Sequence, residues 1–401
     1  MLQRGLEATQ ALVLEHGLAD PALDSVVAPH LPNLGQIPGS NSPPVANFWN
    51  LIYAGQSELM MWWLDRMAVS DHPLAERMTW FWHGHWATAV SKVIYPLAMQ
   101  KQNNTLRGFA LGNFGDMARA MVVDGALNFW LDNEENYLSA PNENMARELM
   151  ELMTIGVNNF TQRDVTQAAR ALTGYSTAQS TGEVTFDPKQ HYSGPITVLD
   201  TTSRLDAQSL ATLLVSKDLN AKFIADRIWF RFVSDTTAAP STLMESFSTR
   251  DIYSLVSTLV RSSAWTNPAN SLVKSPIEWF VGACRALRLR PSTINAGYLQ
   301  WDLSQMGQIP FDPPNVGGWP SGQAWLSGVA FQYRFFTVEL MTKGDLSPIA
   351  VPRSKMVQAC ADWLGIPEWS TRTASTLAAA TSNPLEFATL ALLSPEFTVS
   401  V

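Results

Sequence analysis

The chain has 401 residues, more than the roughly 250–300 that one hydrophobic core usually supports, so we expect one large helical body with lobes or two domains. Hydrophobic residues make up 46% and charged residues 15%, which excludes a chain that is disordered throughout. The formal net charge of −8 and the lack of a Lys/Arg run argue against a surface that binds nucleic acid.

Targeting signals and cysteine motifs are also missing. No run of about 18 apolar residues is present, so no transmembrane helix is expected. The N-terminal segment predicts an amphipathic helix without the features of a signal peptide, so we expect a cytoplasmic protein by default. Cys284 and Cys360 lie far apart and outside any CxxC spacing. This excludes a zinc or redox motif and leaves a single disulfide open.

The predicted organisation has an N-terminal unit and a helical body. Residues 1–45 predict a short helix and then an extended arm, because the second half of this unit is rich in Pro, Gly, Ser and Asn. The body follows over 46–401, with candidate lobes 46–203 and 204–401. A long helix from about Ala46 to Met67 opens it. The dominant helical periodicity predicts a mainly α fold, a large multi-helical orthogonal bundle with a small β-hairpin insertion.

An aromatic segment, ERMTWFWHGHWATAV, follows this first long helix. His83 and His85 would share a face, and could share a metal ion, only on a strand. The surrounding pattern is helical, and on a helix the two rings point about 200° apart. We therefore interpret both histidines as core or pocket-lining residues.

The polar loop LDNEENYLSAPNEN comes next and contains many side-chain amides, including Asn133 and Asn142. Amides in a connection usually cap helices and make turns. They also suit the binding of a hydroxyl-rich ligand. The sequence leaves both interpretations open.

Residues 142–175 are the most informative stretch and predict two helices joined by a short turn. The first begins near Pro141, which suits a first helical turn, and runs to about Thr154 before a left-handed Gly156. The second opens with the capping box of Thr161 and Asp164 and closes at Gly174.

Charged side chains on the first of these helices form a candidate site. On a helical wheel, Glu148 lies nearest the apolar stripe, so it is either paired or has a raised pKa. Glu143, Arg147 and Glu151 are spaced four residues apart and can form a charge ladder. The cluster is therefore either a structural ion-pair network or a buried acid/base site.

Residues 176–202 differ from the helical body. Alternation and β-branched residues predict a β-hairpin between Glu183–Phe186 and Thr197–Leu199, with His191 near its tip. Because this hairpin follows the second central helix, His191 could fold back over Glu148 and Glu151.

A second irregular stretch, PFDPPNVGGWPSGQAW, occupies residues 310–325. Its Pro and Gly residues exclude regular secondary structure and predict a fixed loop that holds Trp319 and Trp325. Such a loop either plugs the core or lines a cleft.

The ordered series of these segments resembles one bacterial family, domain of unknown function 1800. The resemblance rests on NENMARELMELMTIGVNNFTQRDVTQAARALTGY, FWHGHWA, His191 after a short strand, KSPIEWFVGACRAL and PPNVGGWPSGQAW. It implies a mainly α-helical and often exported protein, so a periplasmic or secreted location is the alternative to the cytoplasm. It also implies a sulfatase- or phosphatase-like neighbour protein as a partner. The family's His-Asp pair is here His191 and Tyr192.

Two functional hypotheses follow, and the sequence leaves the choice between enzyme and binding protein open. The first is an enzyme acting on an extracytoplasmic polymer or glycan-like substrate, with Glu148 and Glu151 as acid/base or ligand carboxylates and His191 or His85 as proton shuttle. A divalent metal could serve it, although no complete ligand set is visible. Its substrate-binding residues would be His83, Asn133, Asn142, Glu143, Arg147, Arg170 and Trp319. The second is a non-catalytic protein that binds a glycan or a partner, in which the polar cluster is structural.

Overall fold

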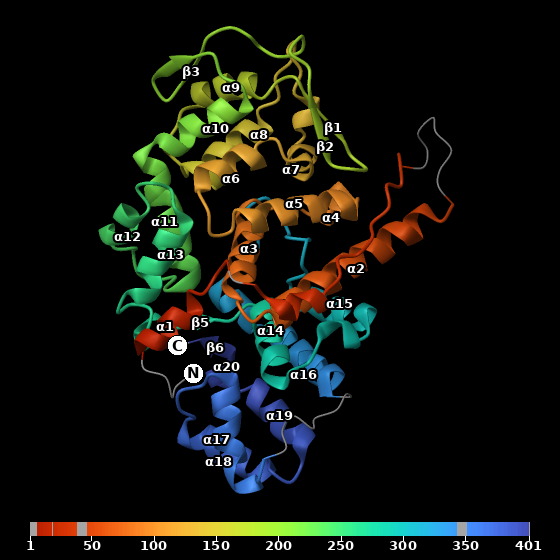
Figure 1. Cartoon of the computed structure of the whole chain (residues 1–401), viewed down its shortest axis with the longest axis vertical. Helices are drawn as coiled ribbons and strands as arrows, with labels where there is room; N and C mark the ends of the chain where they lie inside the picture. The colour runs from red at the N-terminus through yellow and green to blue at the C-terminus, as the bar shows by residue number, and fades with distance from the viewer. Residues whose placement is uncertain (1–5, 18, 38–45, 343–350, 401) are drawn as a thin grey trace.

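Helices dominate the fold (Figure 1). A computed structural model describes residues 6–17, 19–37, 46–342 and 351–400. Over these ranges, strands occur only as three two-stranded antiparallel pairs. The mainly α fold with small hairpin insertions that the sequence predicts is therefore confirmed. None of the helices in the described ranges combines the length and apolar character needed to cross a membrane.

The α-helices and the one π-helix of the first half lie at these positions: α1 (Leu6–Val13), α2 (Phe48–Val69), α3 (Leu74–His85), α4 (Val90–Val93), α5 (Pro96–Gly108), α6 (Phe114–Met121), α7 (Gly125–Trp130), α8 (Asn144–Glu148), the π-helix η3 (Leu149–Thr154) and α9 (Gln162–Ala171). The predicted long first helix of the body is α2. Of the predicted extended arm, residues 26–37 form neither helix nor strand, and residues 38–45 lie outside the described ranges.

The second half continues with α10 (Ala207–Ser216), α11 (Asp218–Phe232), α12 (Ser241–Ser246), α13 (Ile252–Arg261), α14 (Pro276–Leu287), α15 (Ala296–Gln305), α16 (Gly328–Thr342), α17 (Arg353–Leu364), α18 (Thr371–Ala380), α19 (Pro384–Leu392) and α20 (Pro395–Thr398). Short 3-10 helices are η1 (Pro21–Ser25), η2 (Asn133–Glu135), η4 (Pro268–Asn270), η5 (Pro291–Thr293) and η6 (Gly322–Leu326). The strands are β1 (Tyr175–Ala178), β2 (Glu183–Phe186), β3 (Ile196–Val198), β4 (Thr201–Ser203), β5 (Leu272–Val273) and β6 (Val399–Ser400).

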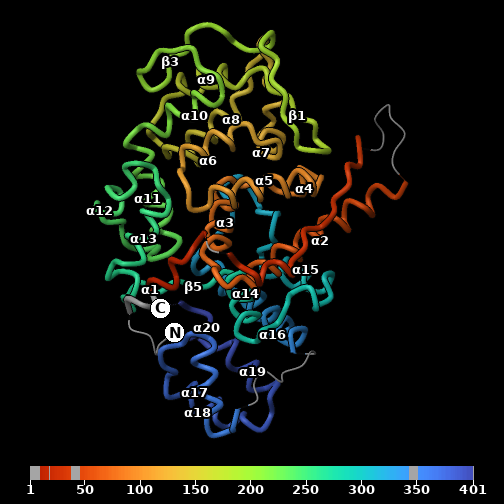
Figure 2. Tube along the Cα trace, viewed as in Figure 1, coloured from red at the N-terminus to blue at the C-terminus, as the bar shows by residue number. Residues whose placement is uncertain are grey.

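Two clusters of buried apolar side chains form the interior. Most of the first comes from helices α5 to α13, and most of the second comes from α2 and from α14 to α19. Helix α3 contributes to both, since Trp82 belongs to the first cluster and Trp80 to the second. Figures 1 and 2 place α3 in the middle of the molecule and α1 beside the much later strand β5. The region bounded by α1, α3 and β5 therefore lies beside the helix that the two cores share.

The predicted hairpin is wrong in its pairing. Strand β2 pairs with β1, and β3 pairs with β4, so the two predicted partner strands belong to separate hairpins. The reason is a tight turn: Leu199 and Asp200 both have positive φ, at 48° and 63°. Positive φ at both central residues is the geometry of a type I′ turn, which joins neighbouring strands directly.

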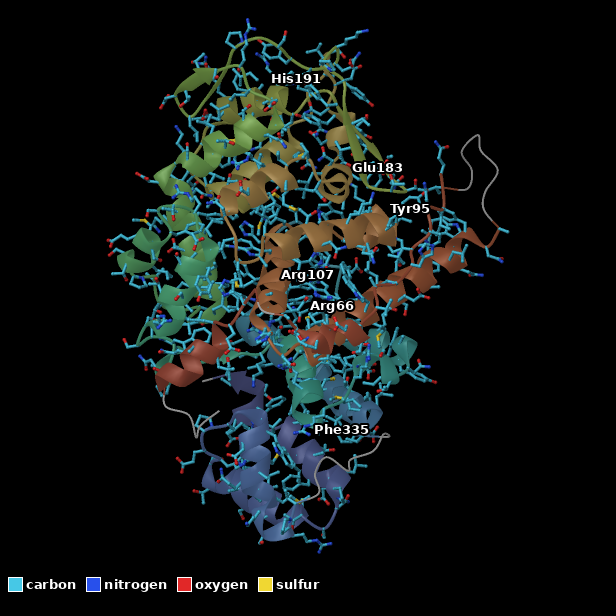
Figure 3. The ribbon with its side chains drawn as sticks, in the orientation of Figure 1. Arg66, Tyr95, Arg107, Glu183, His191 and Phe335 are labelled. Atoms are coloured by element: carbon cyan, nitrogen blue, oxygen red, sulfur yellow. The ribbon has the colours of Figure 1, made fainter. Side chains whose placement is uncertain are left out.

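A buried carboxylate joins three helices of the body. The Glu76 side chain on α3 accepts hydrogen bonds from Arg66 on α2, from Arg107 on α5 and from the Trp63 indole, at distances of 2.7–3.0 Å. Figure 3 shows Arg66 and Arg107 near one another in the middle of the molecule. Although burial by itself would raise the pKa of Glu76, the charges and hydrogen bonds of Arg107 and Arg66 lower it. This group is a fully paired structural ion cluster.

Candidate functional site

The two central helices are present, but the first one changes type partway. Helix α8 passes into the π-helix η3, in which the Met150 carbonyl accepts from the amides of Ile155 and Gly156 at 3.1 and 3.0 Å. Gly156 then has a φ of 83°, the predicted left-handed residue. Helix α9 opens with the predicted Thr161–Asp164 capping box. The two helices are therefore confirmed, with a wide π turn that the sequence did not predict.

The π turn divides the predicted charge ladder. Arg147 pairs with Glu143 at 3.3 Å and also donates to Gln162 at 2.7 Å. The Glu151 side chain makes no hydrogen bond or ion pair within the described part of the chain. Because a π turn closes through i→i+5 bonds, positions after Glu148 no longer follow the α-helical wheel. The structural half of the ladder forms, and Glu151 is left out of it.

Glu148 remains the most unusual carboxylate on this helix pair. Its side chain is half-buried, and the pKa is raised by burial and by the negative charge of Glu151, against the opposing charge of Arg147. A raised pKa is expected both of a functional acid and of a poorly paired structural carboxylate.

The two histidines of α3 are enclosed in the core. His85 donates from Nε2 to the Met153 carbonyl at 2.9 Å. His83 has no hydrogen-bond partner on either ring nitrogen in the described structure, and its ring lies among Trp63, Phe311 and Trp319. Burial lowers the pKa of both histidines to about 3, so both are neutral near pH 7. This is the core role that the helical pattern predicts.

His191 lies on the loop after β2, at the outer end of the molecule (Figure 3). Its Nδ1 contacts the Thr173 carbonyl at 3.0 Å, and its ring packs against Phe186. Its neighbour Tyr192 lies under the guanidinium of Arg170, 5.0 Å from the ring centroid. These contacts hold the loop to the end of α9, and neither Glu148 nor Glu151 has a hydrogen bond or ion pair with His191 in the described ranges.

The amides of the polar loop bind one another and nearby backbone. The Asn133 side chain donates to Asn128 and to the Leu172 carbonyl. Asn142 donates from its backbone to Asn136 and from its side chain to the Asp132 carbonyl. These bonds tie the loop to the end of α9, which favours the capping interpretation of the amides.

The loop over 310–325 sits on the C-terminal end of α3. Trp319 stacks on Trp80 with ring centroids 4.7 Å apart. A Cβ on Gly318 would lie 2.3 Å from the Gly84 carbonyl oxygen, so only glycine allows this approach. The loop plugs the core through Trp319. The prediction that it lacks regular structure is wrong at its end, where the 3-10 helix η6 begins at Gly322. Ser321 and Gly322 line a cavity.

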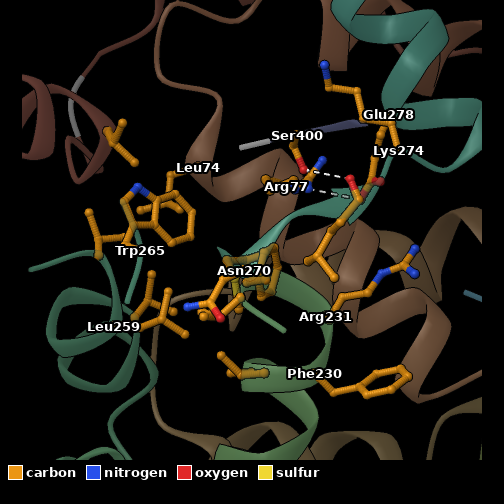
Figure 4. Close-up of a pocket in the computed structure, with 18 of the residues that line it drawn as sticks. Leu74, Arg77, Phe230, Arg231, Leu259, Trp265, Asn270, Lys274, Glu278 and Ser400 are labelled. Atoms are coloured by element: carbon orange, nitrogen blue, oxygen red, sulfur yellow. Dashed lines mark hydrogen bonds and ion pairs between the residues drawn. The ribbon is translucent and has the colours of Figure 1, made fainter. Parts of the chain in front are cut away.

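That cavity has a volume of about 590 Å³ and lies between α1, α3, α11, α13, β5 and α14. In the close-up of Figure 4, apolar side chains form one side of it and charged side chains the other. The apolar side includes Leu74, Leu259 and Trp265, and the charged side includes Arg77, Arg231, Lys274 and Glu278.

The charged side of the cavity centres on Glu278. A capping box at the start of α14 positions this residue: Glu278 accepts from the Ser275 amide, and the Ser275 hydroxyl accepts from the Glu278 amide. Arg77 forms an ion pair with Glu278 at 2.9 Å. Burial by itself would raise the pKa of Glu278, but the charges of Arg77 and Arg231 and the Ser275 bonds lower it to about 2.

Lys274 completes this side of the cavity. Its Nζ donates to the Phe397 carbonyl at 2.6 Å and lies 4.2 Å from the centroid of the Phe397 ring. Burial lowers the pKa of Lys274 to about 8. The cavity therefore combines apolar walls, several converging polar groups and perturbed pKa values, as ligand sites commonly do.

Sequence reasoning missed this site because its charged residues come from three separate segments, at Arg77, at Arg231 and at Lys274 to Glu278. Only Glu278 carried a local signal, the S-x-x-E capping box. Arg231 lies within an aromatic helical segment that predicts nothing beyond a helix. None of the candidate site residues predicted from the sequence lines the cavity. Over the described ranges, no group of three or more His, Cys, Asp or Glu side chains is placed to hold a metal ion.

Comparison with known proteins identifies the family but no characterised relative. No curated protein matches the chain, and no solved structure matches it. The model of one family, described as a protein of unknown function (DUF1800), matches residues 4–399. Since this match covers nearly the whole chain, the protein belongs to the DUF1800 family.

Proposed function

We propose that this chain is a binding protein that holds a largely apolar small molecule in the cavity between α3, α11, α13 and α14. The observation that carries the proposal is the cavity itself, with its apolar walls at Leu74, Leu259 and Trp265. Binding sites for small molecules are typically concave and mostly apolar, with a few converging polar groups. A volume of about 590 Å³ falls within the roughly 300–1,000 Å³ of sites for drug-sized ligands.

The position of the cavity supports the same function. Its walls come from segments at both ends of the chain, including Leu12 on α1 and Ser400 on β6. Its buried apolar lining, such as Met78 and Leu259, belongs to the first hydrophobic cluster. A bound ligand would therefore join these segments and stabilise their packing by mass action.

Filling the cavity should weaken the binding of a neutral apolar probe. We expect N-phenyl-1-naphthylamine to gain fluorescence with the protein, and Ala264→Phe or Leu12→Trp to weaken its affinity at least about tenfold, a loss of about 1.4 kcal/mol. Both residues line the cavity and are partly exposed, so the added atoms can be accommodated without repacking a core. Fluorescence titration measures the affinity.

The matched control is Ala269→Phe, at an exposed position that does not line the cavity, which should leave the affinity unchanged. Equal binding by all the variants, with unchanged thermal melts, would contradict the proposal.

An enzyme is the second candidate function, favoured by the raised pKa of Glu148 beside the π turn. π turns often occur at functional sites. In this alternative, Glu148 acts as acid/base on an extracytoplasmic polymer or glycan-like substrate. An exported location and a sulfatase- or phosphatase-like partner remain proposals that rest on the family resemblance alone.

Thermal melts of glutamine variants test the second candidate. We expect Glu148→Gln to leave the melting temperature unchanged or to raise it, because the neutral amide removes a partly desolvated charge. Glu143→Gln is the control. Glu143 accepts from Arg147, Gln162 and Thr166, so its loss should lower stability by about 1 kcal/mol. A drop of several degrees for Glu148→Gln and Glu151→Gln, with no metal found by analysis and no effect of chelator, would rule out a functional site there.

A further inference from the structure

The charged side of the cavity carries more positive than negative charge. The Arg77–Glu278 pair is neutral as a unit, and Lys274 already donates to a backbone carbonyl. Arg231 adds a guanidinium whose positive charge helps to lower the pKa of Glu278. The acidic residues at the rim, Asp71 and Asp235, are exposed to water. Lys274 and Arg231 therefore both lack a carboxylate of their own, and of these two only Arg231 also lacks a hydrogen-bond acceptor within the described ranges.

Arg231 is the one of these cations whose hydrogen-bond donors are unoccupied in the described structure. Its side chain is half-buried, and it makes no hydrogen bond or ion pair with any part of the chain that the structure describes. Arg227, one turn earlier on α11, lacks such partners in the described ranges too, although burial and the charge of Arg231 lower its pKa. A guanidinium offers five donors in a planar fork. Leaving it half-buried and unpaired costs free energy unless a ligand supplies the acceptor.

The cavity thus has an apolar side and a positively charged side that face each other. Figure 4 shows Leu74, Leu259 and Trp265 on the side opposite Arg231, Lys274 and Glu278. We infer that the ligand is an amphiphile whose carboxylate head binds the guanidinium of Arg231 and whose aliphatic tail lies against Leu74, Leu259 and Trp265. This inference rests on the proposed function, since it names the class of molecule that occupies the same cavity.

A carboxylate fits this charge arrangement better than a phosphate monoester. The planar guanidinium fork of Arg231 can bind both carboxylate oxygens at once. A phosphate monoester would bring nearly two negative charges close to Glu278, which is itself ionised because its pKa lies at about 2. Because Lys274 is held by the Phe397 carbonyl, Arg231 rather than Lys274 offers free donors to a head group in the described structure.

A matched pair of ligands tests the head group. Dodecanoate and 1-dodecanol share a tail and differ only at the head, and both are used below the concentrations at which they aggregate. Each is titrated against the bound naphthylamine probe, and dodecanoate is also titrated directly by calorimetry. We expect dodecanoate to bind about tenfold to a hundredfold more tightly than the alcohol, the value of a charge-assisted hydrogen bond in a partly buried site.

Two arginine variants test whether Arg231 causes the preference for dodecanoate over 1-dodecanol. Arg231→Gln should remove the preference for dodecanoate and leave 1-dodecanol binding nearly unchanged. Arg261→Gln, at an exposed arginine on α13 that does not line the cavity, should keep the full preference. A phosphate head is tested with dodecyl phosphate, which should bind more weakly than dodecanoate.

The outcomes separate this inference from the proposed function. Equal affinity for dodecanoate and 1-dodecanol, with the probe still bound, overturns the carboxylate head while the binding function stands. Tighter binding of dodecyl phosphate also overturns it in favour of a phosphate head. If neither the probe nor dodecanoate binds, the binding function fails, and the head-group inference fails with it.

Discussion

Replacing Glu76 with glutamine should lower the free energy of unfolding by about 3–5 kcal/mol, the usual cost of breaking a buried ion pair from one side. The Glu76 carboxylate is only 3% exposed and accepts from Arg66, Arg107 and Trp63. Glutamine keeps the size of the side chain but removes its charge. The guanidinium groups of Arg66 and Arg107 would then be left without their negative partner.

Urea denaturation measures this effect. Asp226→Asn is the control, because Asp226 pairs with Lys222 only in an exposed i,i+4 bridge, and its loss should stay below about 0.5 kcal/mol. The lowered pKa of Glu76 also sets a pH dependence. Its stabilisation is present above the unfolded pKa of 4.5 and is lost as the pH falls through the folded pKa. The difference in the free energy of unfolding between wild type and Glu76→Gln should therefore become smaller in acid. A decrease of less than about 1 kcal/mol in that free energy at neutral pH would contradict the prediction.

Acid should destabilise the protein strongly through the two buried histidines. The pKa of His83 and His85 is lowered from 6.5 to about 3. A lowered histidine pKa gives stability that is complete above pH 6.5 and is lost as the pH falls from 6.5 toward 3, because the unfolded chain takes up the protons first. At about 1.4 kcal/mol for each pH unit, each histidine contributes up to about 5 kcal/mol of this loss.

His83→Phe tests the prediction. The His83 ring has aromatic neighbours and no hydrogen bond in the described structure, so phenylalanine can replace it without losing a polar partner. We expect the unfolding free energy of this variant to fall less steeply below pH 6.5 than that of wild type. The slope should correspond to about one fewer proton taken up on unfolding. His191→Phe, at a partly exposed site, is the control. A variant slope equal to that of wild type would show that His83 is protonated in the folded protein.

The local chemistry of the sequence determined much of the fold. Thr161 and Asp164 cap α9 as predicted, and Gly156 takes the left-handed conformation that ends the preceding helix. These features depend on atoms within a few residues of one another, so they can be inferred without knowing the neighbours in space. For the same reason, the helical pattern around His83 and His85 was enough to predict that they lie in the core or line a pocket, and both are buried.

Other features were decided only when the chain folded. The π turn after Glu148 excludes Glu151 from the predicted ladder, and the turn at Leu199 and Asp200 pairs β3 with β4. Both depend on conformations that these residue types seldom adopt alone, so surrounding contacts must impose them. The cavity is the clearest case, because Arg231 and Glu278 belong to helices that meet only through tertiary packing. Helical periodicity predicts which face of α11 is buried. It does not predict whether a carboxylate from another helix will form an ion pair with Arg231.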